Sequence, residues 1–225
     1  MEKKKLTIAL AGNPNSGKTT VFNNLTGNRQ KVGNWPGVTV EKKEGNLTFK
    51  KHNFKVIDLP GVYSLTAYSL DEVIARNYIV DEKPDVVVDV VDASSLERNL
   101  YLAVQLLEMQ TSLIIALNMM DVAESRGYRI DVAELSKLLG VPVVPMVAAR
   151  NQGTEKLLQT VIDAAEGGIR VKGINLHYGH DVETEIEKLE KLISGGALAG
   201  SYSPRWLVVK LLEEDKEIEK KVGQS

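Results

Sequence analysis

The chain has 225 residues, of which 43% are hydrophobic and 26% charged, and its formal net charge at pH 7 is −2. This length suits one α/β domain with a smaller second domain, and the balanced charge argues against nucleic acid as a partner. The absence of cysteine excludes disulfides and thiolate metal sites. Because no apolar run reaches the roughly 18 residues of a membrane span, we expect a soluble chain.

The first 166 residues alternate between two kinds of segment. Short apolar segments rich in β-branched residues predict strands at residues 6–11, 54–59, 86–91, 113–117 and 141–147. Apolar residues at helical spacing predict helices at residues 18–25, 70–80, 96–109, 132–139 and 154–165. Residues 39–50 alternate well enough to predict an edge strand, antiparallel to strand 54–59. This order predicts an α/β fold for residues 1–166, with a mostly parallel sheet and helices on both faces.

The composition changes after residue 166. Glycines punctuate a linker, and they are Gly167, Gly168, Gly173 and Gly179. An amphipathic pattern then predicts a helix over residues 181–193. A glycine-rich break at residues 195–200 precedes Pro204 and a predicted last helix over residues 205–222. We therefore predict a small all-helical domain over residues 167–225.

The strongest motif follows the first predicted strand and opens the first predicted helix. It reads Gly12-Asn13-Pro14-Asn15-Ser16-Gly17-Lys18-Thr19 and is followed by Thr20. This is the pattern of a phosphate-binding loop in its required context, in which backbone N–H groups and a helix N-terminus face negative charge. We expect Lys18 to reach the β- and γ-phosphates and the Thr19 hydroxyl to bind Mg²⁺. The loop therefore predicts binding of a nucleoside triphosphate.

Two further segments are placed where sensors of the γ-phosphate belong. Asp58-Leu59-Pro60-Gly61 ends the strand predicted at residues 54–59. Asp58 is expected to hold Mg²⁺ through water, and the Gly61 N–H to contact the γ-phosphate. Thr39, at the end of a predicted loop over residues 28–38, supplies a second hydroxyl for Mg²⁺. The γ-phosphate would order both segments, which hydrolysis would release.

The choice of base is predicted from Asn118-Met119-Met120-Asp121, after the strand at residues 113–117. The Asp121 carboxylate can accept hydrogen bonds from guanine N1–H and N2–H₂, which adenine does not offer, so the ligands are GTP and GDP. Asn118 is expected to tie this segment to the phosphate loop. In a second loop, Val147-Ala148-Ala149, the Ala149 N–H could contact guanine O6.

Two residues of the base site depart from the common GTPase pattern. Met119 replaces a lysine that packs over the base, and Ala148 replaces a serine. Both changes should loosen the pocket, so we predict weak retention of GDP.

The catalytic step has no glutamine to orient water, because Val62 follows Gly61. Asn15 suggests a substitute, in which a monovalent cation held by Asn15 and by nearby switch carbonyls supplies positive charge between the phosphates. The alternative is that Asn15 only caps the loop. The predicted catalytic group is thus Asn15, Lys18, Thr39 and Gly61.

Several of these segments together resemble the FeoB family of ferrous-iron transporters. They are Gly33-Asn34-Trp35-Pro36-Gly37-Val38-Thr39-Val40-Glu41, the stretch from Asp58 to Leu65, the stretch from Val91 to Leu102, Asn118-Met119-Met120-Asp121 and Pro204-Arg205-Trp206-Leu207. The resemblance runs over nearly the whole chain. Met119 and an apolar residue at position 62 are normal in that family, whereas Ala148 remains a departure.

The resemblance carries expectations of its own. It implies that Asn15 and the backbone carbonyls of Gly33 and Trp35 hold K⁺, and that the helical domain steadies bound GDP. It also implies a polytopic membrane domain as partner at the cytoplasmic face of a prokaryotic membrane, so this chain would be a truncated N-terminal portion. Hydrolysis would drive or gate Fe²⁺ uptake, and self-association into oligomers stays open.

Two alternatives stay open on the sequence alone. The first is an RNA- or ribosome-associated GTPase, since such proteins also carry asparagine in the phosphate loop; residues 181–219 hold more acids than bases, which disfavours RNA. The second is a nucleotide-gated binding module with negligible turnover, which Val62 allows. A metal site at His177 and His180 is disfavoured, because no third ligand has suitable spacing.

Overall fold

The computed structural model describes residues 5–27, 30–167, 176–193 and 202–223. A seven-stranded sheet of order β2-β3-β4-β1-β5-β6-β7 forms its centre. The strands are β1 (Lys5–Gly12), β2 (Gln30–Asn34), β3 (Glu41–Phe49), β4 (His52–Asp58), β5 (Val86–Asp92), β6 (Leu113–Asn118) and β7 (Val143–Pro145). Strands β4, β1, β5, β6 and β7 run parallel, whereas β2 and β3 pair antiparallel. The predicted mostly parallel α/β sheet is confirmed.

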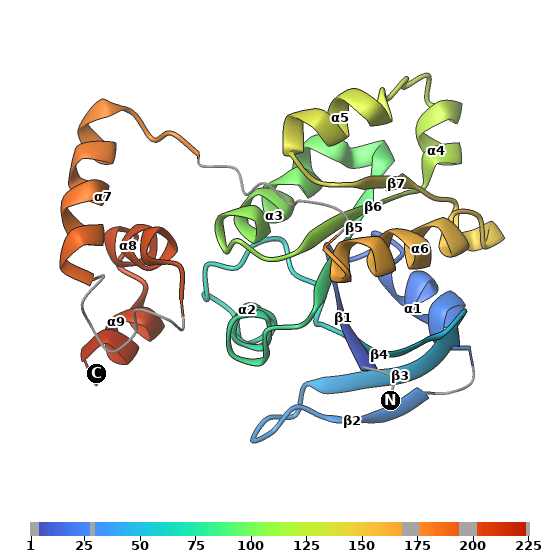
Figure 1. Cartoon of the computed structure of the whole chain (residues 1–225), viewed down its shortest axis with the longest axis horizontal. Coiled ribbons are helices and arrows are strands. Elements are labelled where there is room, and N and C mark those ends of the chain that lie inside the picture. Colours follow the sequence, from blue (N-terminus) through green and yellow to red (C-terminus); the bar gives the residue numbers. More distant parts are fainter. Residues whose placement is uncertain (1–4, 28–29, 168–175, 194–201, 224–225) are drawn as a thin grey trace.

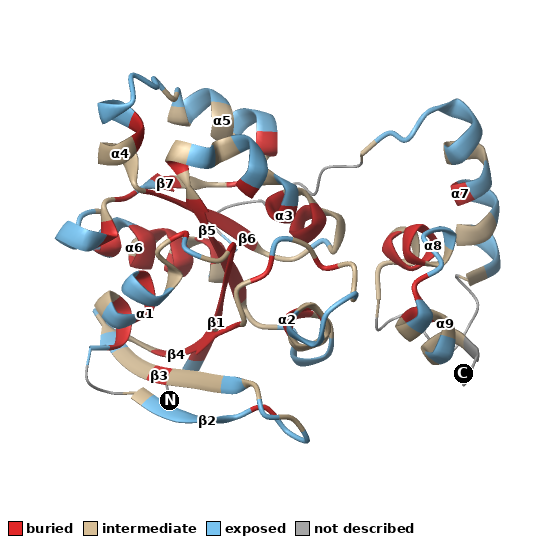
Figure 2. Cartoon of the chain, turned by 180° about the vertical axis from the view of Figure 1, so that it is seen from behind, coloured by how far each residue is buried: buried red, intermediate tan, exposed pale blue. Residues whose placement is uncertain are grey.

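Helices cover both faces of this sheet (Figure 1). They are α1 (Lys18–Thr26), α2 (Leu70–Glu82), α3 (Leu96–Glu108), α4 (Met120–Ser125), α5 (Val132–Leu139) and α6 (Thr154–Ala165). Phe22 of α1 and Val161 of α6 belong to the hydrophobic cluster on one face. Ile79 of α2 and Leu106 of α3 belong to the cluster on the other. Strands β1, β5 and β6 are buried between these layers (Figure 2), which fits their almost unbroken apolar sequences.

The edge of the sheet differs from the prediction. The strand expected over residues 39–50 is β3, but β2 covers its outer side, so β3 is not an edge strand. Strand β2 lies inside the segment predicted as a loop over residues 28–38, of which residues 28 and 29 are outside the described part. The sequence of β2 shows no alternation of apolar and polar residues, because nearly all of the strand is exposed. Backbone pairing to β3 alone defines it, across a turn that contains Pro36 and Gly37.

Three helices pack beside α2 and α3 (Figure 1): α7 (His180–Ile193), α8 (Pro204–Leu212) and α9 (Lys216–Gly223). The helix predicted over residues 181–193 is confirmed by α7. Ile186 of α7 packs against Val208 and Val209 of α8, as its apolar face predicts. Trp206 of α8 lies in a second cluster with Ile218 of α9, against which Val80 of α2 also packs.

The prediction of a single helix over residues 205–222 is wrong. The chain breaks between α8 and α9, where Glu214 has a left-handed φ of 55°. The Asp215 carboxylate then accepts hydrogen bonds from the N–H groups of Glu217 and Ile218 at 3.1 and 3.2 Å. This is an N-cap arrangement, so Asp215 begins a new helix rather than continuing the old one.

Smaller differences concern the ends of elements. Helix α4 was not predicted, and β7 is shorter than the strand expected over residues 141–147. The predicted linker glycines Gly168 and Gly173 and the break at residues 195–200 lie outside the described residues. Within the described part, no helix has the length and apolar character needed to cross a bilayer.

Candidate functional site

The phosphate loop occupies the carboxyl end of β1. Strand β1 ends at Gly12 and α1 begins at Lys18, which is the predicted strand, loop and helix order. Gly17 precedes α1 with a left-handed φ of 87°, and a Cβ there would collide with the side-chain amide of Asn118. Only glycine satisfies both conditions. Asn15 is also left-handed, with φ 67°, a conformation that asparagine tolerates better than most residues.

A cavity of about 510 Å³ opens at this loop. Its lining residues are Asn13, Pro14, Asn15, Gly17, Lys18, Thr19 and Gly61. The structure therefore brings the predicted phosphate-loop residues together with Gly61 of the second switch segment, residues 59–69. A Cβ on Gly61 would lie 3.4 Å from the Pro14 nitrogen, which shows how closely the two backbones approach. Thr20 is exposed beside Thr19 on α1.

Buried polar atoms without partners mark the inside of the loop. Both side-chain amide atoms of Asn13 and the Ser16 Oγ are buried and make no hydrogen bond within the described residues. Leaving such atoms unpaired costs free energy, so orphaned groups in a native structure point to a ligand. The donors fit the oxygens of a phosphate group. The residues present therefore suit the predicted nucleotide.

Lys18, which lines the cavity, forms an ion pair with Asp58 at the end of β4. Their side chains are only 10% and 9% exposed, so the pair is largely shielded from water. Both residues were predicted as ligand-binding groups, Lys18 for phosphate and Asp58 for Mg²⁺. In this state each neutralises the other.

Asn118 connects the base segment to the phosphate loop, as predicted. Its Nδ2 donates to the Ser16 carbonyl at 3.0 Å, and its Oδ1 accepts from the Ala148 N–H at 2.9 Å. The Ala148 carbonyl in turn accepts from the Asn24 side chain of α1 at 2.8 Å. Met119 follows with a left-handed φ of 60° and is the N-cap residue of α4. The buried side-chain amide of Asn118 thus connects its own segment to the phosphate loop and to the loop of residues 147–149.

The carboxylate of Asp121 is partly exposed at the start of α4. Its Oδ2 lies 3.5 Å from Nη2 of Arg150. Arg150 ends a short 3₁₀ turn (Ala148–Arg150) that also contains Ala149 and directly follows Val147. Arg150 was not predicted as a site residue, although its place next to the second base loop, residues 147–149, was a usable signal.

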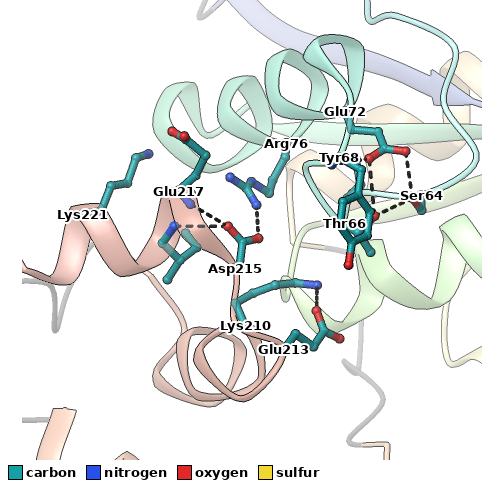
Figure 3. Close-up of polar contacts among 12 residues, drawn as sticks. Ser64, Thr66, Tyr68, Glu72, Arg76, Lys210, Glu213, Asp215, Glu217 and Lys221 are labelled. Atoms are coloured by element: carbon teal, nitrogen blue, oxygen red, sulfur yellow. Dashed lines mark hydrogen bonds and ion pairs between the residues drawn. The ribbon is translucent and has the colours of Figure 1, made fainter.

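The second switch segment is held by residues that the sequence analysis did not identify. Glu72 accepts hydrogen bonds from the Ser64 and Thr66 hydroxyls and from the Tyr68 N–H (Figure 3), at 3.0, 3.3 and 2.9 Å. The Leu65 N–H donates to Gln105 of α3 at 2.7 Å. The same segment buries Val62 in the core, so its side chain does not orient water. The segment is fixed to α2 and α3 rather than to the phosphate loop alone.

The first switch segment, residues 30–40, contributes no residue to the lining of the cavity. Gly33 pairs with Lys42 inside the β2–β3 ladder, and the Trp35 carbonyl accepts from the Val38 N–H at 3.2 Å. Thr39 is exposed in the turn that follows. None of Gly33, Trp35 and Thr39 is among the residues that line the cavity. The ligand sets predicted for K⁺ and for Mg²⁺ are therefore only partly assembled in this state.

No cluster of three or more His, Cys, Asp or Glu side chains suited to a metal ion occurs within the described residues. His177 and His180 lie before and at the start of α7, and His177 accepts from the Gly179 N–H at 3.1 Å. That contact is local to the linker.

Two family models match the chain. Residues 6–161 match the family described as ferrous iron transport protein B, and residues 178–225 match the FeoB cytosolic helical domain. The Fe(2+) transporter FeoB of Escherichia coli (strain K12) is 48% identical over 216 residues, which cover 94% of this chain. They cover 27% of that relative, so the chain spans about a quarter of the length of the curated relatives that it matches.

Solved structures of cytosolic FeoB domains have the same fold. The GDP form II of the T. maritima FeoB cytosolic domain is 41% identical, with a TM-score of 0.93 over 98% of this chain and 86% of that one. Its GMPPNP form is 42% identical, with a TM-score of 0.91 over 97% and 85%. The L. pneumophila FeoB cytosolic domain is 41% identical, with a TM-score of 0.87 over 96% and 84%. The chain therefore belongs to the ferrous iron transport protein B family and has that family's P-loop GTPase fold, followed by its cytosolic helical domain.

Proposed function

We propose that the chain binds GTP and GDP and hydrolyses GTP, with Mg²⁺ as cofactor and K⁺ as activator. The observation that carries this proposal is that the buried polar side chains of Asn13 and Ser16, in the phosphate loop, have no hydrogen-bond partner among the described residues. The GDP and GMPPNP forms of the T. maritima relative support the choice of nucleotide.

Nucleotide binding would begin with the exchange of one ion pair. Lys18 leaves Asp58 and turns its ammonium group to the phosphates, while the freed Asp58 carboxylate joins Thr19 and Thr39 as a Mg²⁺-binding group. When bound, Mg²⁺ supplies positive charge to the β- and γ-phosphate oxygens. Thr19 already lines the cavity, whereas Thr39 must approach it from the β2–β3 turn.

The hydrolytic step would rely on backbone groups and on Asn15. Val62 is buried, so the Gly61 N–H rather than a side chain contacts the γ-phosphate and helps to place the attacking water. Asn15, with the carbonyls of Gly33 and Trp35, would hold K⁺, which supplies positive charge to the phosphates as an arginine does in other GTPases. Gly33 and Trp35 meet this role only after the β2–β3 ladder has opened near them.

Base specificity would come from Asp121, which accepts hydrogen bonds from guanine N1–H and N2–H₂. The N–H of Ala149, in the loop of Val147 and Ala148, would contact guanine O6. Met119 and Ala148 lack the packing and hydroxyl groups of a tightly binding pocket, so the chain should release GDP readily.

We further propose that hydrolysis drives or gates Fe²⁺ uptake at the cytoplasmic face of a prokaryotic membrane. The support is the family and the relatives named Fe(2+) transporters, of whose length the chain spans 27%. The partner would be the polytopic membrane domain of the same transporter. We place the domain boundary between residues 166 and 167. The helical domain would steady bound GDP and couple the GTPase domain to the membrane.

The decisive experiment measures GTP hydrolysis in Na⁺ and in K⁺ buffer, with Mg²⁺, for wild type and Asn15→Ala. We expect K⁺ to accelerate turnover at least several-fold in wild type and not in the variant. Equal rates in both buffers would reject the role of K⁺. GDP binding with no turnover in either buffer would favour a nucleotide-gated binding module instead.

A further inference from the structure

Trp35 is the only buried residue in the turn between β2 and β3. Its side chain is 7% exposed, whereas Asn34, Pro36, Gly37 and Thr39 around it are exposed. In both cartoon views this turn, residues 35–40, extends toward α2 (Figures 1 and 2). An otherwise solvent-facing turn is thus attached to the protein through one large apolar side chain.

The seat of Trp35 is formed by α2 and β3. The ring meets Tyr78 of α2 edge-on, with centroids 5.4 Å apart and an interplanar angle of 71°. The Lys42 ammonium group of β3 lies 4.8 Å from the centroid of the indole ring. Val38 and Val40 pack against the same core cluster. Edge-to-face aromatic and cation–π contacts both favour this position.

The indole N–H of Trp35 is the one polar group of this side chain. The indole Nε1 is buried and has no hydrogen-bond partner within the described residues. A buried tryptophan N–H usually finds an acceptor, and an unpaired one weakens the buried state. Packing therefore holds Trp35 in place, and its side chain makes no hydrogen bond to the described part of the chain that would oppose its withdrawal.

The seated position also determines where the site residues are. The Trp35 N–H donates to the Val40 carbonyl at 2.9 Å, which closes the turn. The closed turn keeps Gly33 in register with Lys42 and leaves Thr39 exposed, away from the residues that line the phosphate cavity. With the turn closed, neither Thr39 nor Gly33 and Trp35 are among the residues that line the cavity.

We propose that Trp35 is an autoinhibitory latch, which rests on Tyr78 in the absence of the γ-phosphate and is withdrawn when the triphosphate complex forms. The proposal rests on the proposed GTPase function. Withdrawal opens the turn, frees the Gly33 and Trp35 carbonyls and carries Thr39 toward the phosphate loop. It also removes an aromatic contact from α2, the helix that carries Glu72 and Arg76.

The latch can be observed directly because the chain has only two tryptophans, Trp35 and Trp206. In Trp206→Phe, all tryptophan fluorescence comes from Trp35. We expect low acrylamide quenching with GDP and Mg²⁺, and several-fold higher quenching with a red-shifted emission in GMPPNP, Mg²⁺ and K⁺. Wild type labelled with 5-fluorotryptophan provides a second readout by ¹⁹F NMR, with the Trp35 resonance assigned by Trp35→Phe.

Nucleotide binding is measured in parallel with fluorescent mant-nucleotides, which keeps two failures apart. Bound GMPPNP with unchanged Trp35 quenching and an unchanged ¹⁹F resonance overturns the latch and leaves the GTPase proposal intact. No binding of either nucleotide rejects the proposed function itself.

A variant pair tests whether Tyr78 is the seat. Tyr78→Ala should lower the K⁺ concentration for half-maximal GTP hydrolysis by about threefold or more, because the closed turn is less populated. Tyr78→Phe keeps the ring and should behave as wild type, as should Tyr101→Ala on the exposed face of α3. Equal K⁺ dependence of Tyr78→Ala and wild type, with unfolding curves showing a folded variant, overturns the proposal.

Discussion

Arg76 of α2 donates a charged hydrogen bond to Asp215 in the turn between α8 and α9 (Figure 3). The side chains are 0% and 3% exposed and lie 139 residues apart in the chain. Asp215 also caps α9, and Nε and Nη2 of Arg76 have no partner within the described residues. One buried ion pair thus joins the helix that follows the second switch segment to the helical domain.

Removing one member of this pair should be strongly destabilising. Asp215→Ala leaves the Arg76 charge buried and unpaired, so we expect the free energy of unfolding in urea to fall by about 3–5 kcal/mol. The matched control is Lys220→Ala, which breaks the exposed pair with Glu217 and should change stability far less. A loss for Asp215→Ala no larger than that of the control would contradict a buried, dry pair.

Asp89 should make stability depend on pH. Burial raises its pKa from 3.8 to about 7, and its Oδ2 has no hydrogen-bond partner within the described residues. The native state therefore keeps a proton that the unfolded chain has released, so the contribution of Asp89 to stability is greatest below about pH 4 and declines up to about pH 7. At about 1.4 kcal/mol per pKa unit, the decline amounts to a few kcal/mol.

The test compares wild type with Asp89→Asn in urea unfolding at pH 4.5 and pH 8. The variant should lack most of this decline, so that its stability relative to wild type is higher at pH 8 than at pH 4.5. Asp71→Asn, an exposed change on α2, should follow the wild-type curve. Parallel pH curves for Asp89→Asn and wild type would show that Asp89 does not titrate in this window.

Asp121→Asn should change the choice of base. The variant cannot accept the two guanine hydrogen bonds, and its NH₂ group would face the N1–H and N2–H₂ donors. We expect GDP affinity to fall about a hundredfold or more, since each charge-assisted hydrogen bond is worth about 1.5–3 kcal/mol. Xanthosine diphosphate, which carries an acceptor in place of the 2-amino group, should bind the variant better than GDP does. Preference for GDP by both proteins in equilibrium titrations would remove Asp121 from the base site.

Glu72→Ala should loosen the second switch segment. The substitution removes the acceptor of Ser64, Thr66 and the Tyr68 N–H at once. We expect amide hydrogen exchange over residues 64–69 to rise about fivefold, because one backbone hydrogen bond is worth about 1 kcal/mol. GTP hydrolysis should fall while GDP affinity changes little, since GDP has no γ-phosphate for this segment to contact. The control is Asp71→Ala. If the Tyr68 amide exchanged no faster in Glu72→Ala than in this control, the role of Glu72 would be contradicted.

The local motifs were predictable, because their chemistry depends on neighbours in the sequence. The phosphate loop needs Gly17, Lys18 and the strand before them, all within one short stretch. Asn118 was expected to reach that loop, and its bonds to Ser16 and Ala148 confirm it. The parallel order of the sheet followed from the alternation of strands and helices.

The parts that could not be predicted depend on contacts between distant residues. Strand β2 is polar and exposed, so only its pairing with β3 defines it. The partner of Arg76 could not be identified from its neighbours in the sequence, because Asp215 lies 139 residues away. The helical pattern continues through Glu214, and only the left-handed turn there separates α8 from α9.

The ion pair between Lys18 and Asp58 has a consequence for what the cavity can admit. Under the proposed function, a nucleotide without magnesium would attract Lys18 but leave the carboxylate of Asp58 unpaired in a place that is 9% exposed. Magnesium without a nucleotide would in turn leave the ammonium group of Lys18 unpaired. Only the two ligands together would satisfy both charges, so the ion pair would favour binding of the complete magnesium–nucleotide complex over either component.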